Sequence, residues 1–142
     1  MNNYRPQYFQ LYELVPPEIF KERGQRAWEM LRPEALAMLD GLRKKFGPIK
    51  INDWMDGGHY TESGLRRFDS KTGAEFSMHR YGCAFDAKFR DVLPAEAHAY
   101  ILAHQGEFPL ITAIEAIEST PTWVHADTRN SDRTGIWIVH PT

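Results

Sequence analysis

Hydrophobic residues recur with the period of a helix in two long segments of the chain. In residues 33–46 apolar side chains return every three or four positions, as expected when one face of a helix packs against a core. Gly47 and Pro48 end this segment, because glycine favours the end of a helix and proline cannot continue it. Residues 94–105 form the second predicted helix, and Pro94 suits its first turn.

Alternating apolar and polar residues predict short strands in the rest of the chain. The predicted strands are residues 49–54, 83–90, 111–117, 122–127 and 135–139. A short turn joins the third strand to the fourth, so these two should form an antiparallel hairpin. In the second strand Asp86 falls on the opposite face from Phe85 and Phe89. Together these elements predict an α+β fold, with a small, mostly antiparallel sheet and helices packed on one side.

The length of 142 residues fits one domain that spans residues 1–142. Hydrophobic residues make up 42% of the chain and charged residues 25%, which is typical of a folded globular protein. Residues 1–48 are expected to supply an aromatic-rich arm and helices, and residues 49–142 the core that carries the candidate site. The polar segment 60–76 is long for a connection in a compact domain, which indicates a functional or mobile loop.

Charge and hydropathy argue against several classes of protein. A formal net charge of −2 offers no basic surface for nucleic acid, and no apolar run approaches the ~20 residues of a membrane span. The first residues lack the apolar core of a signal peptide. We therefore expect a monomer that is made in the cytoplasm and acts elsewhere only after release.

The cysteine content restricts the chemistry that the chain can use. Cys83 is the one cysteine, so no internal disulfide can form and a metal site must draw mainly on His, Asp and Glu. A thiolate at this position could ligate a metal or attack a substrate. We expect Cys83 instead to be a small buried residue between Gly82 and Ala84.

Two histidines and one aspartate are candidates for a shared metal ion. His79 and Asp86 lie seven positions apart, and Gly82 lets the backbone bend between them. His125 lies in an otherwise apolar predicted strand, where an unpaired polar group would be costly. Two imidazoles and a carboxylate suit zinc, and three protein ligands leave room for water, as in catalytic zinc sites. The spacing by itself is also compatible with a simple His–Asp pair or with unrelated residues.

Three segments resemble the M15 zinc peptidases. Residues 77–86 match the pattern S-x-H-x-x-G-x-A-x-D at all five of its defined positions. Residues 63–66 are similar to the family's S-G-x-R segment, and residues 123–127 to the segment that carries the third metal ligand. The family contains D-Ala-D-Ala carboxypeptidases, D-Ala-D-Ala dipeptidases and phage L-alanyl-D-glutamate endolysins, and it shares its fold with the hedgehog signalling domain. The segments occur in family order and cover roughly residues 49–139.

The resemblance implies a hedgehog/DD-peptidase-like fold and a zinc hydrolase that degrades the bacterial cell wall by cutting a peptide bond in peptidoglycan. His79, Asp86 and His125 correspond to the zinc ligands. Arg66 corresponds to the arginine that stabilises the developing oxyanion, where a cation is favourable. Ser77 is expected to anchor the loop before His79 through hydrogen bonds.

The general base is where the chain departs from the family. The dipeptidases have a glutamate three residues before the third ligand, and Thr122 stands there in this sequence. In a hairpin that turns near residue 120, Glu115 would face His125 and could accept a proton from the attacking water. Glu118 and Asp127 remain alternatives.

The missing glutamate leaves a second function open. The domain could be a zinc-binding structural or recognition module of the same fold that does not hydrolyse peptides. The sequence also does not decide among carboxypeptidase, dipeptidase and endopeptidase activity.

Overall fold

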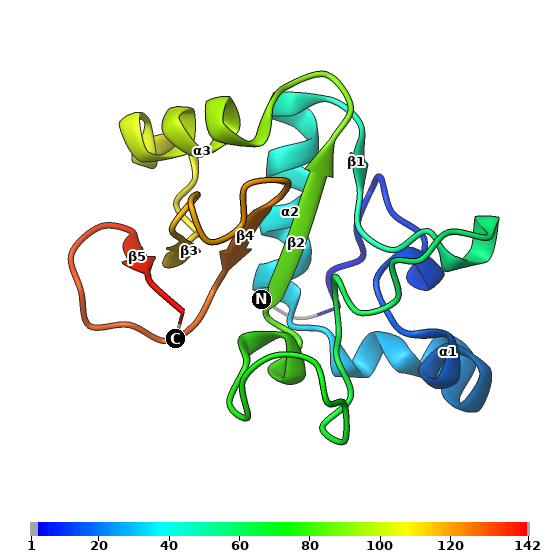
Figure 1. The fold of residues 1–142 in the computed structure, drawn as a ribbon. Helices are drawn as coiled ribbons and strands as arrows, with labels where there is room; N and C mark the ends of the chain where they lie inside the picture. The colour runs from blue at the N-terminus through cyan, green and yellow to red at the C-terminus, as the bar shows by residue number, and fades with distance from the viewer. Residues whose placement is uncertain (1–2, 142) are drawn as a thin grey trace.

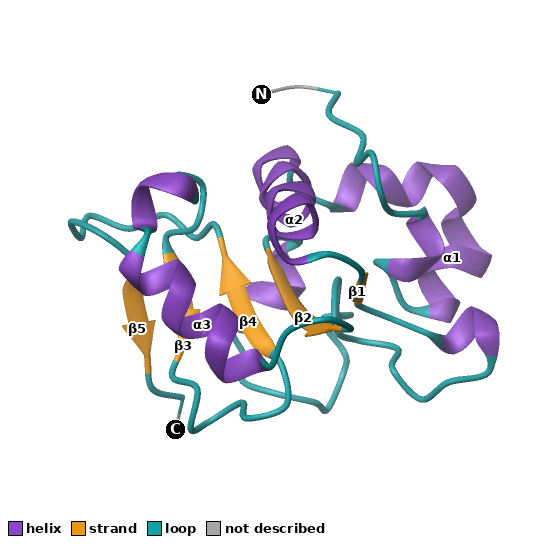
Figure 2. Ribbon diagram, turned by 90° about the horizontal axis from the view of Figure 1, so that it is seen from above, coloured by secondary structure: helices purple, strands orange, loops and turns teal. Residues whose placement is uncertain are grey.

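A computed structural model describes residues 3–141 and shows an α+β domain built on a five-stranded mixed sheet (Figures 1 and 2). The strands are β1 (Ile49–Lys50), β2 (Ala84–Phe89), β3 (Ala113–Glu115), β4 (Val124–Asp127) and β5 (Trp137–Val139). The α-helices are α1 (Pro17–Arg23), α2 (Pro33–Phe46) and α3 (Pro94–Ala103). Short 3-10 helices are η1 (Leu11–Glu13), η2 (Gly24–Met30), η3 (Trp54–Asp56), η4 (Met78–Tyr81) and η5 (Gln105–Glu107). The α+β class expected from the sequence is confirmed.

The sheet has the strand order β1-β2-β4-β3-β5. The pairs β1–β2, β2–β4 and β4–β3 are antiparallel, and the edge strand β5 pairs with β3 in parallel. The predicted hairpin of β3 and β4 is present. Because β2 lies next to β4, segments almost forty residues apart along the chain are neighbours at the centre of the sheet.

Helices α2 and α3 pack on the same face of the sheet. Leu39 of α2 is fully buried, as is Ile101 of α3, and both belong to the hydrophobic core that includes Phe85 of β2. Phe46 at the end of α2 contacts the ring of Tyr100 in α3, with ring centroids 5.9 Å apart. Helix α1 lies beyond the β1 end of the sheet instead of covering its face (Figure 2). The face opposite to α2 and α3 remains for the candidate site.

The predicted strand at residues 49–54 is shorter than expected, since β1 contains only Ile49 and Lys50. The chain leaves the sheet because Asn52 bonds elsewhere. Its backbone N–H donates to the carbonyl of Glu13 at 2.9 Å, and its side-chain oxygen accepts from Ser63 N–H at 2.9 Å. Contacts with distant segments therefore replace the strand ladder at this point.

The N-terminal arm packs along the domain, as its aromatic content predicted; Met1 and Asn2 lie outside the described residues. Asp40 of α2 holds the arm, because its carboxylate accepts hydrogen bonds from Tyr4 Oη at 2.6 Å and from the backbone of Gln7 at 2.7 Å. Further along, Leu14 and Val15 are completely buried. The arm is thus part of the core of the domain.

Candidate metal centre

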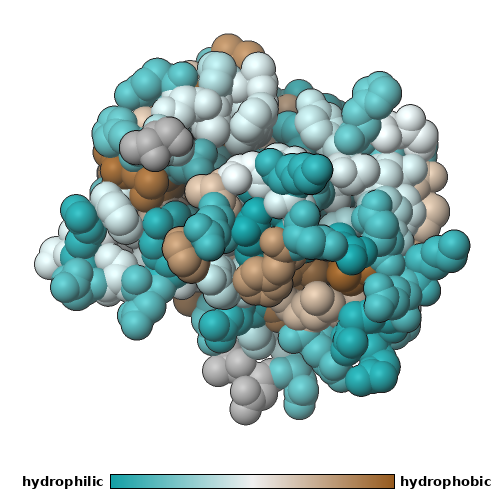
Figure 3. Space-filling view, turned by 60° about the horizontal axis from the view of Figure 1, so that its bottom comes forward, coloured by the Kyte–Doolittle hydropathy of each residue, from teal (hydrophilic) through white to brown (hydrophobic). Residues whose placement is uncertain are grey.

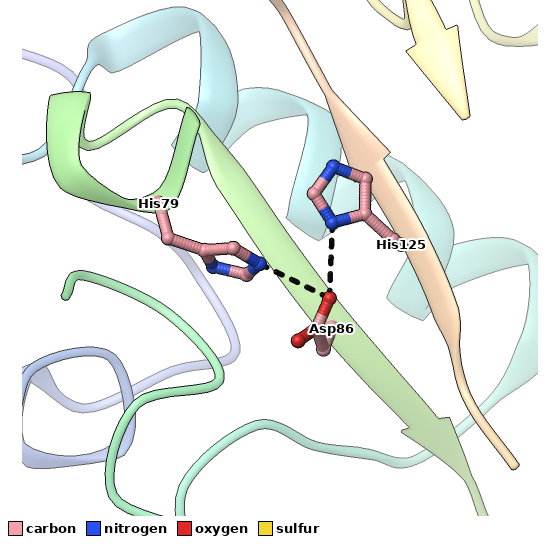
Figure 4. A group of neighbouring side chains, drawn as sticks. All are labelled: His79, Asp86 and His125. Carbon is pink, nitrogen blue, oxygen red and sulfur yellow. Dashed lines mark hydrogen bonds and ion pairs between the residues drawn. The ribbon is translucent and has the colours of Figure 1, made fainter. Parts of the chain in front are cut away.

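His79, Asp86 and His125 converge on one point of the open face of the sheet (Figure 4). Asp86 on β2 is the register partner of His125 on β4, and His79 reaches them from η4. Asp86 Oδ1 lies 3.2 Å from His79 Nε2 and 3.1 Å from His125 Nδ1. One ligand atom from each residue lies within 4.8 Å of the others, so the group is positioned where it could hold a metal ion.

The backbone around His79 and before Asp86 depends on Ser77 and Gly82. Ser77 begins η4, and its hydroxyl accepts a hydrogen bond from the His79 N–H at 3.3 Å. Gly82 ends η4 with φ +70°, and a Cβ there would lie 2.0 Å from the carbonyl oxygen of Met30. Only glycine fits this close approach, which turns the chain into β2 and brings Asp86 towards His79.

Each histidine is held by a hydrogen bond on its outer nitrogen. His79 Nδ1 lies 2.8 Å from the carbonyl oxygen of Gly64, which can only accept, so Nδ1 carries a hydrogen and Nε2, which faces Asp86, is the nitrogen available for a metal. His125 Nε2 lies 2.8 Å from Asp127 Oδ2, so Nδ1 is the nitrogen available for a metal. Outer partners of this kind orient histidine ligands in metal sites.

The electrostatics of the centre favour positive charge. Burial raises the pKa of Asp86, but the neighbouring imidazoles of His79 and His125 outweigh this effect and hold the pKa well below its ordinary value. Burial would lower the pKa of His125, but the hydrogen bonds that its ring donates to Asp127 and Asp86 raise this pKa to about 10. A bound cation would satisfy the same carboxylate that now attracts a proton to the imidazole.

Glu115 lies beside the three candidate ligands. The register of β3 and β4, in which Ile114 faces Ala126, places Glu115 across from His125. Glu115 Oε1 lies 3.6 Å from His125 Nδ1, and the glutamate side chain is 22% exposed at the edge of the cleft. The structure therefore brings Glu115 to the centre in the way that the hairpin argument predicted.

Glu118 and Asp127, the alternative bases, are placed differently. Glu118 follows the end of β3; its side chain is 71% exposed, and its closest ionic partner among the described residues is His140, at 4.0 Å. Asp127 is fully buried, and its carboxylate is bound by Arg129 and by the outer nitrogen of His125. Asp127 thus holds a histidine in place, and its carboxylate faces away from the nitrogen that could bind metal.

Arg66 lies in the wall of the same cleft, which has a volume of about 590 Å³. Its guanidinium donates to Ser77 Oγ at 3.1 Å and to the carbonyl oxygen of Glu62 at 3.3 Å. Gly73 packs directly against this guanidinium, because a Cβ at that glycine would lie 2.4 Å from Arg66 Nη1. Within residues 3–141 the buried Nε–H of Arg66 has no hydrogen-bond partner. The bonds to Ser77 and Glu62 and the contact with Gly73 hold the Arg66 guanidinium in one place beside the candidate ligands.

Large apolar side chains are exposed near this cleft. Phe76, which lines the cleft, is 70% exposed, and Trp123 and Val139 also line it. In the face that Figure 3 presents, hydrophobic side chains gather near the centre among hydrophilic ones. A ligand in the cleft would therefore meet apolar as well as polar groups.

Two features of the centre were absent from the sequence-based prediction. Arg129 forms a bidentate ion pair with Asp127, and a D-x-R spacing at the end of a predicted strand is the signal that could have indicated it. The carbonyl of Gly64 leaves no such signal, because every residue has a carbonyl. Cys83 is buried as expected, and burial raises the pKa of its thiol to about 11, which suits a packing residue.

Comparisons with known proteins identify no relative. No protein-family model matches the chain, and no match was found among curated proteins or among solved structures. None of the helices in residues 3–141 combines the length and apolarity needed to cross a membrane.

Proposed function

We propose that the protein is a zinc metallopeptidase with a hedgehog/DD-peptidase-like fold that hydrolyses a peptide bond in bacterial peptidoglycan. The observation that carries the proposal is the convergence of His79, Asp86 and His125, with Glu115 at their side and Arg66 in the same cleft. Two imidazole nitrogens and one carboxylate oxygen are a donor set that suits zinc better than magnesium or calcium. The choice of peptidoglycan as the substrate depends on the resemblance of residues 77–86 to the M15 signature.

The residues of the centre divide the chemistry among them. Zinc bound here would act as a Lewis acid and lower the pKa of a bound water to about 7. Glu115 is the base that takes a proton from the attacking water and later returns it to the leaving amine. Arg66 stabilises the negative charge that develops on the carbonyl oxygen, and its fixed guanidinium needs little reorganisation to do so.

The cut bond belongs to a peptide of the wall, and the enzyme is of the carboxypeptidase or L-alanyl-D-glutamate peptidase type. The exposed Phe76 at the cleft supplies an apolar contact for such a peptide. An endolysin-like enzyme of this kind would reach the wall when the host cell is opened.

Digestion of purified peptidoglycan tests the proposal, with mass spectrometry of the released muropeptides identifying the bond. His79→Ala should lose both zinc and cleavage, because it removes a ligand. Glu115→Gln should keep zinc and lose cleavage, because the amide cannot accept the proton. A fully active Glu115→Gln protein would refute the assignment of the base.

The second candidate is a zinc-binding structural or recognition module that does not hydrolyse peptides. Thr122, which stands where the dipeptidases have their glutamate, is the observation that favours it. Stoichiometric zinc together with no newly released amino or carboxyl termini in digested peptidoglycan would select this candidate over the peptidase.

A further inference from the structure

The segment formed by Ser63, Gly64 and Leu65 contacts two of the three candidate ligands. The carbonyl of Ser63 accepts the backbone N–H of Asp86 at 2.7 Å. The carbonyl of Gly64 lies 2.8 Å from His79 Nδ1, accepts its hydrogen and so orients the ring. A shift of the 63–65 segment would therefore turn the His79 ring and move Asp86 at the same time.

Asn52 ties this segment to the N-terminal arm. Its side-chain oxygen accepts the Ser63 N–H at 2.9 Å, and its side-chain nitrogen donates to the carbonyl of Val15 at 3.1 Å. Its own backbone N–H donates to the carbonyl of Glu13 at 2.9 Å. The residue is only 5% exposed, so water does not compete freely for these bonds. The side-chain amide of Asn52 thus accepts a hydrogen bond from the 63–65 segment and donates one to the N-terminal arm.

The arm also touches the segment directly. The backbone N–H of Leu65 donates to the carbonyl of Leu14 at 2.8 Å. A Cβ added to Gly64 would lie 2.4 Å from that same carbonyl oxygen, so the two backbones are in close contact. In Figure 1 the blue N-terminal arm accordingly runs beside the green loop that follows β1. The position of the Gly64 carbonyl is therefore set by the arm.

We propose that Asn52 is a positioning residue for the metal centre, through which the N-terminal arm holds the carbonyl of Gly64 against His79. This proposal adds a positioning residue to the metal centre, and it rests on the proposed function because positioning matters only if the centre binds a metal. On this proposal, Asn52 and the N-terminal arm, which precede residues 63–66, help to position His79 and Asp86. Asn52 touches none of His79, Asp86 and His125, so its effect on the centre has to pass through the 63–65 segment.

Replacement of Asn52 by leucine tests the proposal, because leucine has a similar size and can make none of these bonds. In metal-free protein at fixed pH, ¹H–¹⁵N spectra of the wild type should show a single Nδ1–H of His79 that is protected from exchange by its hydrogen bond to the carbonyl of Gly64. Asn52→Leu should lose this protected signal, and it should weaken zinc binding about 10–100-fold, because it misplaces the carbonyl of Gly64, which is the outer partner of His79. Ile101→Ala, a substitution in α3 that also destabilises the core, should leave both the spectrum and the zinc affinity unchanged.

A purely structural role for Asn52 would give a different result. Asn52→Leu would then lower the melting temperature as Ile101→Ala does, while the His79 spectrum and the zinc affinity stayed those of the wild type; that result overturns the proposal. If Asn52→Leu does not fold, Asn52→Asp decides, because it keeps the acceptor for Ser63 and loses the donor to Val15. An unchanged His79 spectrum in Asn52→Asp would equally overturn it.

The two proposals can fail separately. The spectrum of the metal-free protein reports on His79 without zinc or substrate, so it tests the role of Asn52 even if no peptide is cleaved. If the wild-type protein with zinc cleaves no peptidoglycan while Asn52→Leu changes the His79 spectrum, the peptidase is refuted and the positioning role of Asn52 is supported.

Discussion

Replacement of Asp127 by asparagine isolates the contribution of the buried carboxylate behind His125. In the wild type this carboxylate accepts His125 Nε2–H at 2.8 Å and two bonds from the Arg129 guanidinium, at 2.8 and 2.6 Å. Asparagine keeps the size and one acceptor oxygen but removes the charge. The Nδ1 lone pair of His125 becomes a weaker donor to a metal, because the negative charge behind the ring has gone.

Two magnitudes follow from this geometry. Zinc affinity should fall about 10–100-fold, the usual cost of losing an outer partner of a histidine ligand. The free energy of unfolding of the metal-free protein should fall by about 1–3 kcal/mol, because the fully buried carboxylate loses its charge while Arg129, which lines the cleft with its side chain 17% exposed, keeps partial access to water.

Competition with a chromophoric chelator measures the zinc affinity, and urea unfolding of the metal-free protein measures the stability. Asp91→Asn is the matched control, because Asp91 pairs with Arg90 on the surface, where the two side chains are 51% and 70% exposed. The control should leave zinc affinity and stability within a few tenths of a kcal/mol of the wild type. Wild-type zinc affinity in Asp127→Asn would refute the argument that this carboxylate orients His125.

Three further predictions concern the frame around the centre. Gly82→Ala should lower the melting temperature sharply and remove metal binding. Residue 82 has φ +70°, and the new Cβ would lie 2.0 Å from the carbonyl oxygen of Met30. The control Gly41→Ala, on an open helix surface, should instead raise the free energy of unfolding by about 0.5–1 kcal/mol. Asp40→Ala should cost about 2–3 kcal/mol and expose the N-terminal arm to limited proteolysis, since it removes the acceptor of bonds at 2.6 and 2.7 Å; an arm as resistant as in the wild type would contradict this. Cys83 should resist iodoacetamide at pH 8 in the native protein and react after unfolding, because burial raises its pKa to about 11. The pKa of this thiol is higher in the folded state than in the unfolded state. The stability that the neutral thiol contributes is therefore complete below pH 9.0 and is lost as the pH rises through about 11. Urea titrations of the wild type and Cys83→Ala at alkaline pH would detect this loss.

Local patterns in the sequence predicted much of the fold, whereas the meeting of the candidate ligands was expected mainly from the resemblance of residues 77–86 and 123–127 to a known motif. The end of α2 follows from Gly47, whose φ of +84° suits the close of a helix. Glu115 faces His125 because residues of an antiparallel hairpin pair symmetrically about its turn, and this symmetry needs only the turn to be located. Alternation along β2 was enough to separate the Asp86 face from the Phe85 face.

The remaining features depend on contacts that leave no local pattern. Backbone carbonyls such as that of Leu14, which accepts the Leu65 N–H, are common to all residues, and their partners are decided by the whole fold. The predicted strand at 49–54 ended early for the same reason, because Asn52 bonds to segments on both sides of it along the chain. The exposure of Glu118 could not be predicted either. Strand β3 ends at Glu115, so Glu118 lies outside the sheet, and its side chain is 71% exposed.

The charges around the site support the proposed divalent cation, which would take the place of the proton now shared with Asp86. Asp127 is neutralised by Arg129, which leaves the carboxylates of Asp86 and Glu115 facing two imidazoles that are neutral when they act as ligands. Buried carboxylates without a counter-charge are costly, and a cation with two positive charges balances both of them. Imidazole nitrogens on two sides make zinc a better match than a cation that prefers oxygen alone. A metal bound here would need both rings to turn a lone pair inwards, and the bonds of their outer nitrogens to the carbonyl of Gly64 and the carboxylate of Asp127 support that orientation.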